Sequence, residues 1–106
     1  MKPVRLLVDA EAEIDSALAW YRQEVPHRTA VFADALDKAL KAIGSAPETC
    51  PSVDLPAGAP DVRRAPVRGF PWGVFFLDLA TEVIVIAVAH ARREPGYWLD
   101  RLPPPR

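Results

Sequence analysis

Val83-Ile84-Val85-Ile86-Ala87-Val88-Ala89 is the most apolar run in this 106-residue chain, and the prediction of the fold begins with it. β-Branched side chains dominate the run, and such residues favour an extended backbone. Neither alternate set of positions carries a polar residue, so both faces of this strand should be buried. The run therefore predicts a central strand, with helices on one face and a further layer or a partner on the other. It is far too short to span a bilayer.

Two further strands are expected just before this run. Val62–Val67 alternates well enough for a strand, although Pro66 within it suits only an edge or a bulge. Residues 74–77 form the next strand after a turn at residues 68–71, and a second turn at residues 78–82 leads into the apolar run. A short first strand is expected at residues 3–8. A long loop rich in proline and glycine occupies residues 48–61.

The segment between the first strand and this loop predicts two helices, because apolar residues recur there at steps of three and four. The apolar positions of the first helix are Ile14, Ala17, Leu18, Tyr21 and Val25. Those of the second are Phe32, Ala35, Leu36, Ala39, Leu40 and Ile43. Asp9 is expected to cap the first helix and Pro26 to end it, while Gly44 should cap the C-terminus of the second. So short a link predicts an antiparallel helical hairpin.

The predicted order is strand, helix, helix and then three consecutive strands. The simplest fold is α+β, with an N-terminal strand and a helical hairpin packed on a small, largely antiparallel sheet. A chain of 106 residues has room for one domain, so residues 1–106 are predicted to form one, with residues 101–106 as a frayed tail.

Charge is divided unevenly along the chain. Residues 1–61 hold six basic and ten acidic side chains, whereas residues 62–106 hold seven basic and four acidic ones. All seven of those basic residues are arginine, whose planar fork matches phosphate and carboxylate groups. The small basic half therefore favours a polyanion or an acidic peptide as partner.

Several classes of function lack their sequence signatures. The chain has no glycine-rich phosphate loop, and its two histidines have no partners at metal-ligand spacing, so neither a cofactor nor a metal is expected. The single cysteine, Cys50, cannot form an internal disulfide. The N-terminus leads into no apolar segment typical of a signal peptide, so we expect a cytoplasmic protein with no membrane partner. We also expect no small-molecule substrate.

The last third of the chain contains the candidate binding residues. If the second and fourth strands flank the third, one end of the sheet gathers several cations and aromatic rings, as a polyanion site requires. The predicted binding residues are Arg63, Arg64, Arg68, Arg92, Arg93, Tyr97 and Trp98, with His90 beside them. A structural interpretation of each stays open: one arginine pairs with a helix acid, the rings fill the core, and the histidine has no titrating role.

These residues also carry a family resemblance over about residues 3–101. The chain resembles the RelE/ParE toxins of bacterial type II toxin–antitoxin pairs. The matching motifs are Val62-Arg63-Arg64, Gly69-Phe70-Pro71-Trp72, the apolar run ending in His90, Arg92-Arg93-Glu94-Pro95-Gly96-Tyr97-Trp98, and Ala19-Trp20-Tyr21 in the first helix. The resemblance implies the fold described above and a toxin held inactive by a cognate antitoxin. It further implies one of two targets: DNA gyrase for ParE-like members, or mRNA on the ribosome for RelE-like members.

The match to the RNA-cutting branch is partial. Arg64 and Tyr97 fit a cation and a tyrosine that the cutters use, and His90 and Arg93 complete a candidate catalytic set of Arg64, His90, Arg93 and Tyr97. Three positions depart from the cutters' pattern: Pro66, Gly73 and Ala91 stand where cations are expected. The sequence therefore favours a non-enzymatic, ParE-like inhibitor of gyrase. A ribosome-dependent endoribonuclease and a non-toxic relic that only binds the antitoxin remain the alternatives.

Overall fold

The computed structural model describes residues 1–103, and the chain order of its elements is the predicted one. The strands and helices are β1 (Val4–Leu6), α1 (Val8–Glu24), α2 (Thr29–Ser45), β2 (Val62–Val67), β3 (Trp72–Asp78) and β4 (Val83–His90). Short 3₁₀ turns lie at Pro26–Arg28, Pro47–Thr49 and Leu99–Arg101.

The four strands form one mixed sheet in the order β1-β4-β3-β2. β4 lies between β1, which is parallel to it, and β3, which is antiparallel, so the predicted central position of the apolar run is confirmed. β2 pairs with β3 in antiparallel register and forms an edge of the sheet. Pro66 therefore sits in an edge strand, as expected, because an edge needs no ladder donor at every position.

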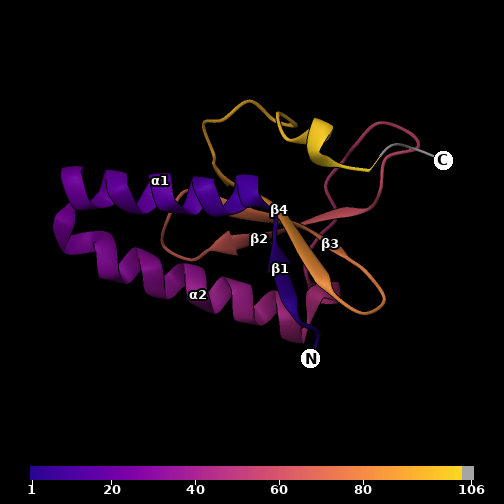
Figure 1. Ribbon diagram of the computed structural model, residues 1–106, viewed down its shortest axis with the longest axis horizontal. Coiled ribbons are helices and arrows are strands. Elements are labelled where there is room, and N and C mark those ends of the chain that lie inside the picture. The colour runs from indigo at the N-terminus through magenta and orange to yellow at the C-terminus, as the bar shows by residue number, and fades with distance from the viewer. Residues whose placement is uncertain (104–106) are drawn as a thin grey trace.

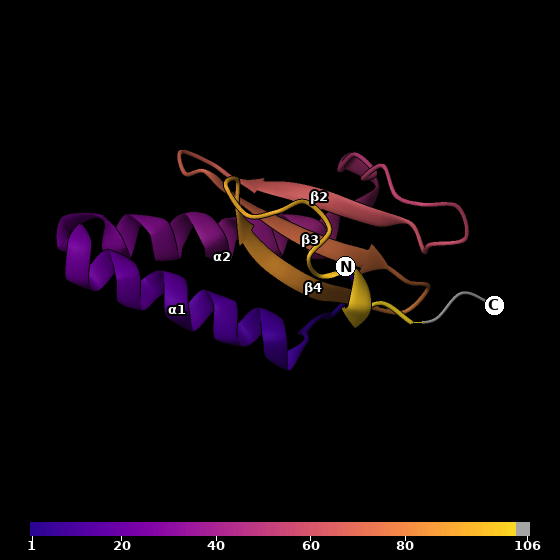
Figure 2. The same ribbon diagram turned by 90° about the horizontal axis from the view of Figure 1, so that it is seen from above.

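The two helices form an antiparallel hairpin that covers one face of the sheet (Figures 1 and 2). Phe32 and Ile43 of α2 are fully buried, together with Phe76 and Val85 of the sheet. The ring of Tyr21 from α1 stacks on Phe32 with the centroids 4.6 Å apart, which adds a favourable aromatic contact to area burial. The helical apolar stripes of the sequence thus build the main core.

The opposite face of the sheet is covered by the chain itself. The C-terminal segment, yellow in Figure 2, runs across the strands and inserts Trp98. This side chain is only 2% exposed and packs with Ile86 and Leu77 in a second apolar cluster, which Leu102 and Leu55 border. The further layer predicted from the apolar run is therefore supplied within the chain.

Three local expectations are corrected. The first helix begins at Val8 with Leu7 as its N-cap, so Asp9 lies inside the helix and caps nothing. Gly44 is also inside its helix, where a Cβ would lie 3.1 Å from the Lys2 carbonyl oxygen; it permits close packing of α2 on the N-terminal strand. Arg101, expected in a frayed tail, is firmly held by contacts described below, whereas residues 104–106 of that expected tail lie outside the described residues.

Candidate functional site

Two backbone groups of β4, beside a β-bulge and past the end of its pairing with β1, bond to side chains. Phe75 pairs with Ala87 and Phe76 with Val85, so Ile86 is an extra residue in β4. A bulge interrupts the hydrogen-bond ladder and turns the backbone groups beside it away from their usual partners. Such groups are costly when they are partly buried without partners. Side chains from both ends of the chain supply those partners.

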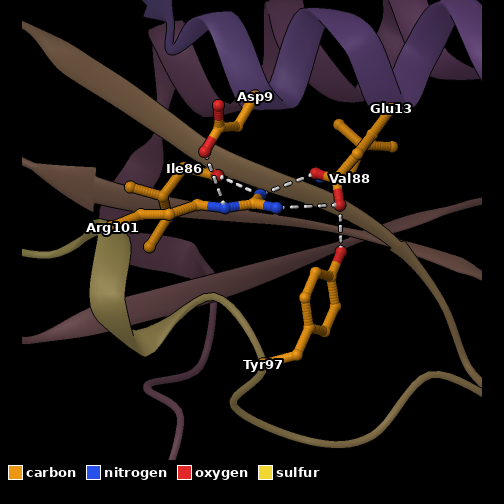
Figure 3. Close-up of polar contacts among 6 residues, drawn as sticks. All are labelled: Asp9, Glu13, Ile86, Val88, Tyr97 and Arg101. Carbon is orange, nitrogen blue, oxygen red and sulfur yellow. Dashed lines mark hydrogen bonds and ion pairs between the residues drawn. The ribbon is translucent and has the colours of Figure 1, made fainter.

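Glu13 of α1 is the acceptor at the centre of this arrangement (Figure 3). Its Oε1 accepts hydrogen bonds from the backbone N–H of Val88 at 3.1 Å and from Arg101 Nη1 at 2.9 Å. Its Oε2 accepts a short hydrogen bond from the Tyr97 hydroxyl and a longer one, of 3.4 Å, from Arg101 Nη2. One helix carboxylate thus joins the bulged strand to the C-terminal segment.

Arg101 completes the arrangement from the other side. Its Nη1 donates to the carbonyl oxygen of Ile86 at 3.0 Å, and its Nε lies 3.2 Å from a carboxylate oxygen of Asp9. The Arg101 side chain is 17% exposed and that of Glu13 is 18% exposed. We call Asp9, Glu13, Tyr97 and Arg101 the Glu13 cluster. It fixes the C-terminal segment against α1. It also supplies hydrogen-bond partners for the Val88 N–H and the Ile86 carbonyl oxygen beside the bulge.

The Glu13 cluster changes the acid–base character of its members. Burial first, and then the hydrogen bond and negative charge of Glu13, raise the pKa of Tyr97 to about 12. Burial alone would lower the pKa of Arg101, but the hydrogen bond and charge of Glu13 reverse that effect and raise it. Tyr97 therefore stays protonated at neutral pH, with its proton directed at Glu13.

A concavity of about 250 Å³ beside the Glu13 cluster, with Tyr97 in common, brings together the four residues of the candidate catalytic set. Arg64 and Arg93 line it with His90 and Tyr97, so the predicted convergence at one end of the sheet is present. The Arg93 guanidinium lies 3.9 Å from the centroid of the Tyr97 ring. Within residues 1–103, neither arginine forms an ion pair or a side-chain hydrogen bond. We call this site the arginine concavity.

The Arg64 side chain and the His90 ring have defined positions in the arginine concavity. A Cβ added at Gly73 would lie 2.5 Å from Arg64 Nε, so the Arg64 side chain occupies the space over that glycine. His90 packs edge to face on Trp72, with the ring centroids 5.2 Å apart. Its Nδ1 accepts a hydrogen bond from the Arg92 backbone N–H at 3.0 Å, which leaves Nε2 as the protonated nitrogen of the neutral ring.

The remaining predicted binding residues do not join this concavity as a group. Arg63 donates to the carbonyl oxygen of Cys50 at 2.7 Å and lies 3.5 Å from an Asp61 carboxylate oxygen, so it holds the loop before β2. Arg68 is exposed, in a different groove between α2 and β2. Trp98 lines the concavity but is a core residue, and Arg92 lines a neighbouring groove.

That neighbouring groove was not predicted from the sequence. It has a volume of about 570 Å³ and lies between the C-terminal half of α1 and the β2–β3 turn. Its aromatic lining residues are Trp20, Tyr21, Phe70 and Trp72, and we call it the aromatic groove. The Arg28 guanidinium lies 4.4 Å from the centroid of the Phe70 ring. Trp20 was the available signal, because it falls outside the apolar stripe of its helix.

Two general properties of the described part of the chain bear on its chemistry. Residues 1–103 contain no group of three or more His, Cys, Asp or Glu side chains placed to hold a metal ion. In the same part of the chain, no helix combines the length and the hydropathy that crossing a bilayer demands.

Comparisons with known proteins define the class. The model of the family described as "ParE toxin of type II toxin-antitoxin system, parDE" matches residues 4–95. A solved structure of the chromosomal ParDE toxin–antitoxin system from P. aeruginosa is similar in fold, with a TM-score of 0.70 and 14% identity over 85% of this chain and 96% of that chain. A search of curated proteins found no match. Because the family model covers most of the sequence, the chain belongs to the ParE toxin family of type II toxin–antitoxin systems.

Proposed function

We propose that this chain acts in the cytoplasm as an inhibitor of DNA gyrase that binds its target without cutting nucleic acid, and that a cognate antitoxin neutralises it. Membership of the ParE toxin family supports the toxin role and an antitoxin partner. One observation carries the choice of mechanism: the Tyr97 hydroxyl donates a hydrogen bond to Glu13 and therefore serves as a structural donor.

The chemistry of RNA cleavage explains why this observation matters. Attack by a 2′-hydroxyl needs a base, cations that offset the charge of the phosphorane, and an acid for the leaving oxygen. A tyrosine whose pKa is raised to about 12 is a poor base at neutral pH. Positions 66, 73 and 91 contribute no cation, and one missing charge-stabilising donor typically costs about 3–4 kcal/mol of transition-state stabilisation. The site is thus better suited to binding than to catalysis.

The direct test is a gyrase supercoiling assay with the purified chain. We expect inhibition at micromolar concentration, and restoration of supercoiling when the antitoxin is added in equal amount. Heat-denatured chain serves as the control for non-specific effects. Unchanged supercoiling at that concentration contradicts gyrase as the target.

A ribosome-dependent endoribonuclease is the second candidate, and the arginine concavity favours it. Arg64, His90 and Arg93 open onto one cavity, where they can contact a phosphodiester group. The test is cleavage of mRNA in the ribosomal A site by wild type, by His90→Ala and by Tyr97→Phe. This candidate requires cleavage by wild type and its loss in both variants, and intact mRNA with the wild-type chain rules it out.

A further inference from the structure

The covering of the sheet leaves the aromatic groove open, and this is one of several grooves among the described residues. The helical hairpin covers one face of the sheet, and the C-terminal segment covers the other. The outer edge of β2 is partly occupied too, because Ser52 bridges to Arg63 and the Arg64 N–H donates to the Pro51 carbonyl oxygen. The aromatic groove stays accessible, and its wall residue Trp20 is 52% exposed although its indole is large and mostly apolar.

The charges around the aromatic groove have one sign. Arg28 and Arg92 line it, and no acidic side chain does. The groove between α2 and β2 offers a contrast within the same molecule. It is of similar size, about 490 Å³, and includes Val31 at 53% exposed, but Asp34 and Lys38 in its wall pair with each other at 2.9 Å. Of these two grooves, the aromatic groove is the one that combines several rings with arginines that have no acid in the lining.

We propose that the aromatic groove is the docking site for an acidic segment of the antitoxin. A bulky apolar side chain of that segment packs against Trp20 and Trp72, and its carboxylates pair with Arg28 and Arg92. The inference deepens the proposed function, since it rests on the antitoxin partnership, and it assigns that partner a place and a chemistry. Aromatic and arginine side chains are also the types that carry most binding energy in interfaces.

His90 connects this docking site to the arginine concavity. His90 lines both the aromatic groove and the arginine concavity. A segment seated in the groove therefore lies at the border of the concavity that holds Arg64 and Arg93. Neutralisation follows from covering that border, with no rearrangement of the toxin required.

The test uses the full chain, with its three tryptophans replaced by 5-fluorotryptophan, and the cognate antitoxin. Fluorine NMR then reports Trp20, Trp72 and Trp98 separately. On addition of the antitoxin, the signals of Trp20 and Trp72 should move. Trp98, buried beneath the C-terminal segment, is the internal control and should keep its shift.

Matched variants supply the energetic test. We expect Trp20→Ala, and separately the double change Arg28→Glu with Arg92→Glu, to weaken antitoxin binding by roughly 30-fold or more, as loss of an interface anchor does. Val31→Ala changes an equally exposed apolar residue in the other groove, and Lys38→Glu reverses a cation in its wall. These controls should change the dissociation constant by less than about threefold.

Three outcomes overturn the proposal, and they differ in what else they affect. Equal antitoxin affinity of wild type and both groove variants removes the docking site but leaves the partnership and gyrase inhibition standing. Loss of gyrase inhibition in Trp20→Ala with unchanged antitoxin binding assigns the groove to the target instead. No binding of the antitoxin to wild type refutes the partnership and the groove together, whereas the supercoiling assay still decides the target.

Discussion

Two arginines contact the ring of Tyr97, and they belong to regions with opposite roles. The Arg101 guanidinium lies 5.2 Å from the ring centroid and is fully engaged by acids and backbone in the Glu13 cluster. The Arg93 guanidinium lies 3.9 Å from the same centroid and faces the arginine concavity without an acid partner among residues 1–103. The difference shows that a cation becomes available for a partner only where the fold leaves it without a carboxylate.

The cause of this difference is local. Beside the bulge at Ile86, and past the last β4 residue that pairs with β1, Glu13 and Arg101 bond to backbone groups of β4. At the end of β4 the Arg93 N–H donates to the His90 carbonyl oxygen, and the Arg93 side chain stays exposed. The Glu13 cluster is thus a structural solution, while the arginine concavity is free for binding.

The largest effect should follow from removing the centre of the Glu13 cluster. Glu13→Ala leaves Arg101, the Tyr97 hydroxyl and the Val88 N–H without their acceptor. Because the ion pair is mostly buried, we expect the free energy of unfolding to fall by about 3 kcal/mol. Urea denaturation measures it. Glu11→Ala, an exposed acid on the same helix, is the control and should change stability by less than about 0.5 kcal/mol.

The two arginines beside Tyr97 provide the next comparison. Arg101→Ala should lower the free energy of unfolding by about 2 kcal/mol, because it removes hydrogen bonds to Glu13 and Ile86 at a partly buried site. Arg93→Ala should change it by less than about 0.5 kcal/mol, since an exposed cation without an ion pair contributes little. Equal losses in the two variants would show that both arginines are structural.

Tyr97 gives the cluster a dependence on alkaline pH. Its pKa is about 12 in the folded chain against about 10 for a free tyrosine, so the folded state holds the proton more tightly. The stability due to this shift is complete below pH 10 and decreases as pH rises from 10 to 12. Allowing for solvent screening, we expect the difference between wild type and Tyr97→Phe to shrink by about 1 kcal/mol over that range. A constant difference contradicts the raised pKa of Tyr97 in the folded chain.

The smallest effect on stability is expected in the arginine concavity. In Gly73→Ala the new methyl group meets only the flexible end of Arg64, which can move aside. The free energy of unfolding should therefore change by less than about 0.5 kcal/mol. Displacement of Arg64 should nevertheless weaken gyrase inhibition if this cation contacts the target. If a folded Gly73→Ala chain inhibits gyrase as strongly as wild type, Arg64 does not contact the target.

Much of the fold could be predicted from the sequence because its main signals are periodic. The apolar run at β4 indicated a central strand, the three- and four-residue spacings indicated both helices, and Pro66 indicated an edge strand. The gathering of Arg64, His90 and Arg93 at one end of the sheet was expected only if the second and fourth strands flank the third, as they do.

The remaining features have no periodic signal. A β-bulge at Ile86 depends on the pairing of two strands, so nothing in a run of apolar residues indicates it. Since the sequence gives no sign of the bulge, it also gives no reason to expect that Glu13 pairs with Arg101, 88 positions away. The aromatic groove likewise depends on packing the β2–β3 turn against α1, which places Phe70 and Trp72 beside Trp20 only in three dimensions.

The most direct test of the account is the gyrase-inhibition curve of Tyr97→Phe beside that of the wild-type chain. The phenylalanine keeps the ring under Arg93 and removes only the hydroxyl. If Tyr97 is a structural donor in a binding toxin, the folded variant should inhibit gyrase within about threefold of wild type. A folded variant that loses activity by about 100-fold or more, the loss typical of a missing acid–base group, contradicts the account.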